Sequence, residues 1–401
     1  MNNIRKTSKF VYKYSDLLLI VIFNGILILK TLLTEITYDE AYTFLNYVIT
    51  DNVFNIGIAN NHLLNTLLMW VTTQFSYSEL FIRLPNLISG IIYSYYVYLI
   101  FKHKPYKYLG YSIFLTNPYI LDYFTIARGY GLSVLLMFLS SFFYLETHGK
   151  RILLPVLLIV LATLSYHPLV IFLIIFWVFN IKNLKLELSN IKFILISFLL
   201  CLYIAIIVYI LFNITSTGKP LFGTQYLSLP NLIFTGFGFE QLYISNNYLI
   251  TYLSKIIFFL PLLLLSSFKY YQKMFLLISY CSVVLLYLIP FILEKPYPLL
   301  RAILPFIPPF LFLFYYAASN LFNSLKRDYT LPLIIIIISI LSVNAMFQVS
   351  LYQTINWKNS YNQADIIARS ENSCEYIIPT ENLSPVGEYY RFIASISKND
   401  C

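Results

Sequence analysis

Charged side chains are scarce in this chain. Only 11% of its 401 residues are Asp, Glu, Lys or Arg, whereas 59% are hydrophobic, and the mean hydropathy is +0.72. Soluble globular proteins typically carry about 25% charged residues, so this composition excludes that class. Apolar runs near the length needed to cross a hydrocarbon core of about 30 Å recur along nearly the whole chain. The sequence therefore predicts an all-α polytopic membrane protein.

Metal-ligand patterns and cleavage signals are also missing. Histidine occurs four times, and no pair has a metal-ligand spacing such as His-x-x-x-His, so the sequence indicates no metal and no cofactor. The net charge of +9 does not indicate a nucleic-acid partner, because the basic residues lie in short clusters between apolar runs and set membrane topology instead. No small-residue cleavage pattern follows the first run, Leu17–Leu33, so we expect this run to remain as an anchor.

The basic clusters predict the number of membrane crossings. Four basic residues precede the first apolar run and place the N-terminus in the cytoplasm by the positive-inside rule. If all later basic clusters lie on the same side, the parity of crossings between them is fixed. About eleven helices satisfy this condition: 15–34, 80–101, 106–122, 128–147, 152–165, 168–181, 192–213, 249–268, 274–293, 300–322 and 330–348. The pair at 152–181 is then a short hairpin whose outer tip carries His167.

The loops divide the chain into a transmembrane domain, 1–348, and a polar C-terminal segment, 349–401, which we expect outside the cell. Residues 62–76 of the first outer loop are apolar but too short to span, and predict an interfacial helix. The second outer loop, 214–248, contains four glycines and is either a mobile lid or a flexible linker.

Two adjacent carboxylates, Asp39 and Glu40, directly follow the first apolar run. Neighbouring residues point in different directions, so one carboxylate can act on a substrate while the other positions it. A charge this close to hydrocarbon is costly unless it faces water or a partner, which makes the pair a candidate functional site. The alternative is that the two acids only mark the water-facing end of a helix.

Three arginines lie near the predicted outer face. Arg83 follows Glu79 by four residues at a helix start, which favours a local ion pair. Arg128 has apolar surroundings with only Asp122 nearby in sequence, and Arg301 opens an apolar helix. A guanidinium stays charged and bonds two oxygens at once, so Arg128 and Arg301 suit a lipid phosphate. Snorkelling towards headgroups is the alternative.

Two histidines, His62 and His167, lie near predicted helix ends on the same side. Each can donate or accept a hydrogen bond at neutral pH, so we include both as candidate substrate-binding residues. Lone histidines near helix ends are more often satisfied polar residues without a role in binding.

Five motifs occur in an order that resembles a known family. They are Tyr38–Tyr42, Asn61–Leu68, Glu79–Pro85, Ala127–Leu132 and Tyr297–Pro308. Together they resemble the GT-C glycosyltransferases, and within them the bacterial relatives of protein O-mannosyltransferases and of the lipid A aminoarabinose transferase. The resemblance covers about 1–180 and returns at about 297–312.

The resemblance implies a GT-C-like bundle that transfers a sugar, with inversion, from a polyprenyl-phosphate donor to a lipid, glycan or protein acceptor. The reaction would take place at the outer face of a bacterial plasma membrane. Asp39 corresponds to the catalytic base and Glu40 to its support, while Arg128 and Arg301 correspond to arginines near the lipid phosphate.

Two other function classes have similar compositions. A transporter or flippase for lipid-linked saccharides would also be polytopic, but the sequence contains no internal repeat and no matched pair of broken helices. A glycan polymerase or ligase would concentrate basic residues in large later loops, whereas the strongest motif here directly follows the first helix.

Overall fold

The chain folds into a helical bundle. The computed structural model describes residues 2–34, 36–54, 61–216, 258–292 and 300–324, together with Val386, Tyr389, Tyr390 and Phe392. Regular structure in this part of the chain is entirely helical. Seven of its helices are long and apolar enough to cross a membrane. The protein is therefore an all-α, multi-pass membrane protein.

The described helices follow the apolar runs closely. They are α1 (Asn2–Leu33), α2 (Tyr38–Thr43), the π-helix η1 (Phe44–Val48), α3 (Leu63–Thr73), α4 (Glu79–Phe101), α5 (Lys107–Leu115), α6 (Pro118–Thr125), α7 (Gly129–Glu146), α8 (Leu153–Ser165), the 3-10 helix η2 (His167–Leu169), α9 (Val170–Glu187), α10 (Asn190–Ser216), the 3-10 helix η4 (Leu265–Ser267), α13 (Tyr270–Ile292), the 3-10 helix η5 (Leu300–Phe306) and α14 (Ile307–Ser324). The expected span at 249–268 lies partly outside the described residues, and the expected span at 330–348 lies wholly outside them. The count of eleven spans therefore stays a prediction. The lid or linker predicted at 214–248 also stays a prediction, because most of this segment lies outside the described residues.

The prediction of one continuous helix at 106–122 is wrong. The chain forms two short helices, α5 and α6, that break at Thr116 and Asn117. Pro118 disfavours the helical conformation at the residue before it, so a helix cannot easily run through Asn117. The Asn117 side chain accepts a hydrogen bond from the Ile120 backbone N–H at 3.2 Å and thereby caps the new helix.

The predicted hairpin at 152–181 is confirmed, with α8 and α9 joined through η2. Its second helix is longer than expected and continues to Glu187. The Glu187 carboxylate accepts hydrogen bonds from the backbone N–H groups of Ile152 and Leu153 at the start of α8. One acidic side chain therefore closes the open end of the hairpin and satisfies donors that a helix start leaves unpaired.

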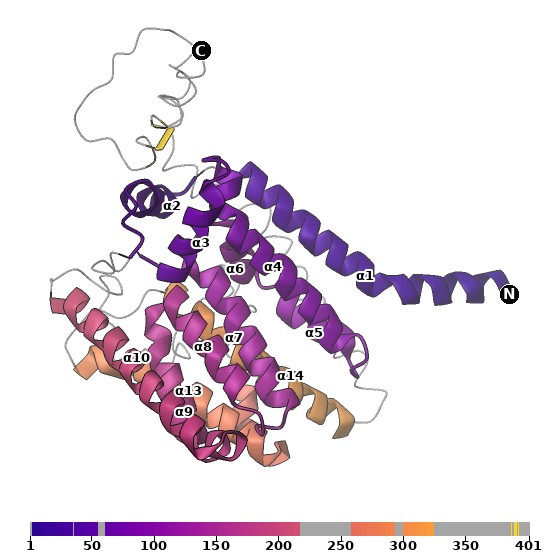
Figure 1. The fold of residues 1–401 in the computed structure, drawn as a ribbon. Helices are drawn as coiled ribbons and strands as arrows, with labels where there is room; N and C mark the ends of the chain where they lie inside the picture. The colour runs from indigo at the N-terminus through magenta and orange to yellow at the C-terminus, as the bar shows by residue number, and fades with distance from the viewer. Residues whose placement is uncertain are drawn as a thin grey trace, which may run out of the picture.

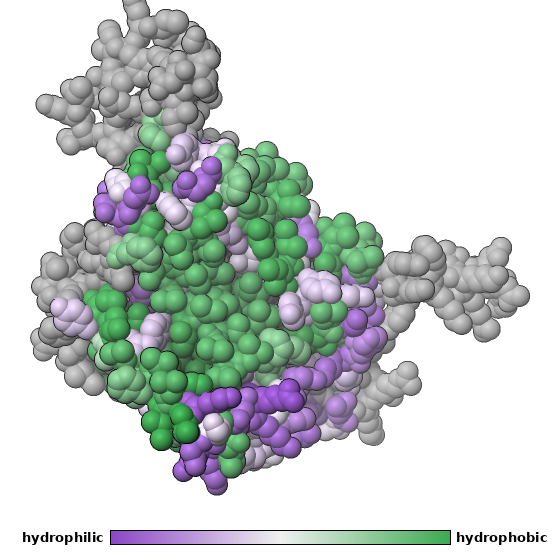
Figure 2. Space-filling model, viewed as in Figure 1, coloured by the Kyte–Doolittle hydropathy of each residue, from purple (hydrophilic) through white to green (hydrophobic). Residues whose placement is uncertain are grey.

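The two ends of the bundle differ in chemistry. Helices α4, α7, α8, α9 and α10 run side by side, and α2 and α3 lie at one end, which we call the α2 end (Figure 1). At the opposite end, Lys107 pairs with Asp16 at 2.8 Å and Lys104 lies 3.9 Å from Glu146. Figure 2 shows a broad hydrophobic band with a hydrophilic edge at this second end and hydrophilic patches near α2. A lipid bilayer fits this band, because its two borders are polar.

Aromatic side chains fill the interior of the bundle. The rings of Phe114, Phe138 and Phe312 lie within 5.4 Å of one another by their centroids. They come from α5, α7 and α14, so residues far apart in sequence form one core. This packing fixes α7 and the start of α14 relative to each other, and η5 packs against α7 as well.

Candidate functional site

The acidic motif forms a short helix at the α2 end. Thr37 is the N-cap of α2: its side-chain oxygen accepts from the Glu40 backbone N–H at 3.3 Å, and the Glu40 carboxylate accepts from the Thr37 backbone N–H at 2.7 Å. This reciprocal arrangement is a capping box, which fixes where a helix begins. Asp39 and Glu40 are therefore held in one defined orientation and point in different directions.

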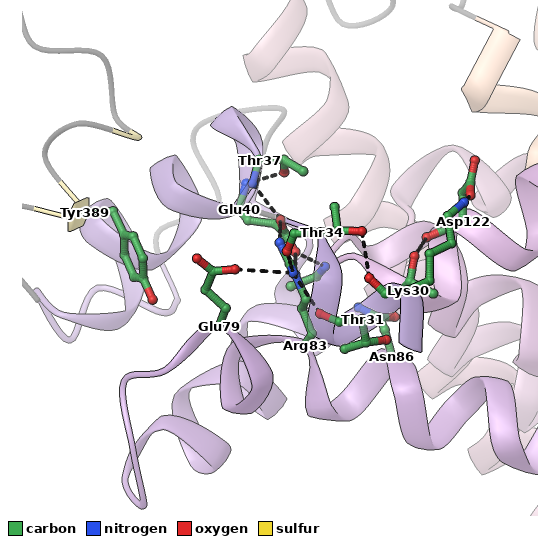
Figure 3. A network of polar contacts seen from close by, with 12 residues as sticks. Lys30, Thr31, Thr34, Thr37, Glu40, Glu79, Arg83, Asn86, Asp122 and Tyr389 are labelled. Atoms are coloured by element: carbon green, nitrogen blue, oxygen red, sulfur yellow. Dashed lines mark hydrogen bonds and ion pairs between the residues drawn. The ribbon is translucent and has the colours of Figure 1, made fainter. Parts of the chain in front are cut away.

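The Glu40 carboxylate is fully buried and accepts four hydrogen bonds (Figure 3). Its Oε1 accepts from Arg83 Nε at 2.8 Å and from the Ala127 backbone N–H at 2.6 Å. Its Oε2 accepts from Arg83 Nη2 at 2.9 Å and from the Thr37 N–H. The two parallel bonds to Arg83 form the bidentate pairing that is the strongest between these groups. Glu40 thus joins α2 to α4 and to the segment before α7.

Arg83 uses its remaining donors on the end of α1. Its Nη1 donates to the backbone carbonyl oxygens of Thr31, at 3.1 Å, and of Thr34. Glu79 Oε2 lies 3.5 Å from the same nitrogen, so the expected local pair is confirmed but is secondary to the pair with Glu40. A cation at the C-terminal carbonyls of a helix is electrostatically favourable.

The environment of Glu40 keeps it ionised. Burial alone raises the pKa of the Glu40 carboxyl. The charge of Arg83 and the hydrogen bonds from Arg83, Ala127 and Thr37 together outweigh burial, so the pKa ends below its ordinary value. A carboxylate that is saturated by donors and held ionised is not available to take a proton from a substrate.

Asp39 has a different environment from its neighbour. Its side chain is 18% exposed, and its Oδ2 lies 3.1 Å from Nη1 of Arg128, which is only 4% exposed. Arg128 is the N-cap residue of α7, in extended conformation. Of the two acids, Asp39 is therefore the one that solvent reaches, and it is paired with one of the predicted phosphate-binding arginines.

The nearest acid to Arg128 in sequence pairs with another residue. Asp122 forms an ion pair with Lys30 of α1, and both side chains are mostly buried. Nearness in sequence therefore does not make Asp122 the partner of Arg128, because Asp122 of α6 pairs with Lys30 of α1. The Lys30–Asp122 pair lies beside the Arg83 network, as Figure 3 shows.

His62 lies close to Arg128 through one aromatic ring. The Arg128 guanidinium is 5.7 Å from the ring centre of Tyr130, and the His62 ring packs edge-on against the same tyrosine at 5.2 Å. His62 Nδ1 lies 2.9 Å from the Ser165 carbonyl oxygen, so this nitrogen carries the proton. Gly129 permits this packing, because a Cβ there would lie 2.1 Å from the same carbonyl oxygen.

The other two predicted site residues, His167 and Arg301, lie in the 3-10 helices η2 and η5. His167 is buried in η2, with Nδ1 at 3.0 Å from the Thr163 carbonyl oxygen. Arg301 lies in η5, and its side chain falls outside the described residues. The structure thus brings together Asp39, Glu40, Arg128 and His62, and places His167 in the neighbouring turn of the hairpin.

Sequence reasoning missed two parts of the network. The pattern Thr37-x-x-Glu40 has the form of a capping box, so it signals that Glu40 belongs to the helix start. The partner of Glu40, Arg83, lies 43 residues away and no local pattern points to it. Tyr390, which donates to Glu79 at 2.8 Å, is more distant still in the sequence.

Within the described residues, no group of three or more His, Cys, Asp or Glu side chains could hold a metal ion. Comparison with protein-family models, with curated proteins and with solved structures finds no match to this chain.

Proposed function

We propose that this chain is a GT-C-like membrane glycosyltransferase, which moves a sugar from a polyprenyl-phosphate donor to an acceptor at the outer face. The observation that carries the proposal is the difference in environment between two adjacent acidic side chains. Glu40 is buried and saturated by hydrogen bonds, while Asp39 is partly exposed beside Arg128. A carboxylate next to a fixed cation, at the edge of an apolar bundle, suits a reaction between a donor that carries a phosphate and an acceptor that carries a hydroxyl or amine.

Asp39 is the general base in this proposal. The acceptor hydroxyl or amine attacks the anomeric carbon, and Asp39 takes its proton as the new glycosidic bond forms. The bond between the anomeric carbon and the phosphate oxygen breaks, and its electron pair leaves with the polyprenyl phosphate. Attack from the face opposite the phosphate inverts the configuration at the anomeric carbon.

Arg128 serves the phosphate. Its guanidinium is already in place and nearly dehydrated, so it can stabilise the negative charge that develops on the leaving group. The guanidinium pairs with Asp39, with Arg128 Nη1 at 3.1 Å from Asp39 Oδ2. A donor phosphate competes for the same nitrogen and releases the carboxylate. Donor binding therefore prepares the base for the acceptor.

Glu40 and Arg83 position the reacting groups without touching the substrate. They hold the start of α2 against α4 and against the Ala127 backbone, one residue before Arg128. Asp39 and Arg128 are thereby fixed relative to each other through one buried ion pair. Such preorganisation is what a displacement reaction requires of a protein site.

The experiment is a transfer assay. Membranes that contain the protein are incubated with a panel of radiolabelled polyprenyl-phosphate sugars, and the label is followed into acceptors. We expect label to leave the lipid and free polyprenyl phosphate to form, with wild type but not with Asp39→Asn. Label that crosses the bilayer while still attached to its lipid would indicate a flippase. Transfer of whole lipid-linked chains would indicate a ligase.

A further inference from the structure

Four described residues near the C-terminus pack onto the acidic motif. Val386 and Tyr389 are buried in a small hydrophobic cluster separate from the main core of the bundle. Its other buried members are Ile36, Ala41, Phe44, Val48, Met69, Ile82 and Ala127. Ala41 follows Glu40, and Ala127 precedes Arg128. The residues close to the C-terminus therefore complete the apolar support of the candidate site.

Aromatic contacts fix this arrangement. The Phe44 ring, just after α2, lies 5.5 Å from the ring of Tyr389 and 5.9 Å from that of Phe392, both in edge-on geometry. Phe392 also packs edge-on against Tyr77 at 5.6 Å. Edge-on aromatic pairs stabilise a contact beyond the area that they bury. Several such contacts converge on the residues directly following the acidic motif.

Two tyrosine hydroxyls give the contact a polar component. Tyr389 donates to the backbone carbonyl oxygen of Tyr77 at 3.0 Å, and Tyr390 donates to Glu79 Oε1 at 2.8 Å. The other oxygen of Glu79 lies 3.5 Å from Arg83 Nη1. Figure 3 shows Tyr389 on the side of Glu79 that faces away from Arg83. A continuous chain of contacts thus leads from Tyr390 to Arg83.

Charge explains why Glu79 needs this donor. One guanidinium, Arg83, faces two acidic side chains, Glu40 and Glu79, and burial together with the charge of Glu40 raises the pKa of the Glu79 carboxyl. A hydroxyl that donates to Glu79 stabilises its ionised form. It also holds Glu79 at the edge of the network, so that Arg83 keeps its bidentate pairing with Glu40.

We propose that Val386, Tyr389, Tyr390 and Phe392 form a C-terminal anchor, whose binding surface is α2, Phe44 and Tyr77. Within it, Tyr390 is a positioning residue for Asp39 that acts through Glu79, Arg83 and Glu40. The anchor itself does not depend on the chemistry of the site, whereas the positioning role rests on the proposed function.

Docking of the anchor is tested by thiol labelling. The four native cysteines are replaced, and Val386→Cys or the exposed Ser78→Cys is introduced at the α2 end. We expect a membrane-impermeant maleimide to label position 386 at least about tenfold more slowly than position 78, because a buried thiol reacts only after local opening. Adding Phe392→Ala should remove most of this protection. Equal labelling of both positions in the otherwise intact protein overturns the anchor.

The positioning role is tested by kinetics. Tyr390→Phe removes only the hydroxyl, and we expect turnover to fall about tenfold with an unchanged KM for the donor, since one hydrogen bond to a charged group is lost. Tyr95→Phe, on the exposed face of α4, is the matched control and should behave like wild type. Glu79→Leu removes the acceptor, so it should make a further Tyr390→Phe change nearly silent, because both changes act through one contact.

The outcomes separate the two claims. Additive effects of Glu79→Leu and Tyr390→Phe, or equal turnover of Tyr390→Phe and Tyr95→Phe, overturn the positioning role even if position 386 is protected. If wild type transfers no sugar while position 386 is protected, the proposed function and the positioning role both fail and the anchor stands.

Discussion

Replacing Glu40 with glutamine should strongly destabilise the protein, although the two side chains have nearly the same shape. Each Glu40 oxygen accepts two hydrogen bonds, one from Arg83 and one from a backbone N–H. An amide has one NH2 group in place of one oxygen. In either orientation of the glutamine amide, this NH2 group faces two buried N–H donors. The substitution also leaves the fully buried Arg83 without its main counter-charge.

The size of the effect follows from these contacts. Removing one partner of a buried ion pair costs about 3–5 kcal/mol, because the other charge stays buried and uncompensated. That is a large part of the roughly 5–15 kcal/mol by which folded proteins are stable. Asp39→Asn is the matched control: its side chain is partly exposed, and an asparagine oxygen can still lie beside the Arg128 guanidinium. We expect it to cost about 1 kcal/mol.

The assay compares thermal unfolding of the two purified variants and wild type in the same detergent, followed by loss of the monodisperse peak in size-exclusion chromatography. Glu40→Gln should unfold at a clearly lower temperature than Asp39→Asn. Replacing both Glu40 and Arg83 with leucine should recover part of the loss, since no unpaired charge remains. Equal unfolding temperatures for the two single variants would refute the assignment of Glu40 to structure and Asp39 to chemistry.

Three further predictions concern charge and topology. Arg128→Ala should abolish turnover or raise the donor KM, and Arg128→Lys should restore it only in part, because lysine lacks the bidentate fork; steady-state kinetics test this. Since the pKa of Glu40 lies below its ordinary value of 4.5, its stabilising effect is present above that pH and is lost as the pH falls through the folded-state pKa. Unfolding temperatures measured against pH should therefore drop more steeply in acid for wild type than for Glu40→Gln. Finally, Asp51→Cys should react with an impermeant thiol reagent in intact cells, and protection of this position would contradict an outer α2 end.

Local features of this fold could be read from the sequence. The lengths of α4 and α7, the short helix α3 and the hairpin of α8 and α9 follow from apolar runs and their breaks, which are properties of neighbouring residues. The break before Pro118 has a local signal as well, although apolar residues on both sides of the proline favoured one continuous helix.

The connections within the site could not be read in the same way. Glu40 meets Arg83 across 43 residues, and Tyr390 meets Glu79 across 311. Which charges pair depends on how helices pack, and several acids were available to each arginine. Asp122 illustrates this, since it is closest to Arg128 in sequence and yet pairs with Lys30. The sequence indicated which residues were unusual, and the packing of the helices decided their partners.

The measurement that tests the proposed chemistry most directly is the turnover of Asp39→Asn at matched membrane levels, with binding of the polyprenyl-phosphate sugar measured separately. Asparagine keeps the shape of aspartate and cannot take a proton. We therefore expect normal insertion and donor binding, together with a loss of turnover of about a hundredfold or more, the usual scale for loss of a general base. Wild-type turnover from Asp39→Asn would contradict the account.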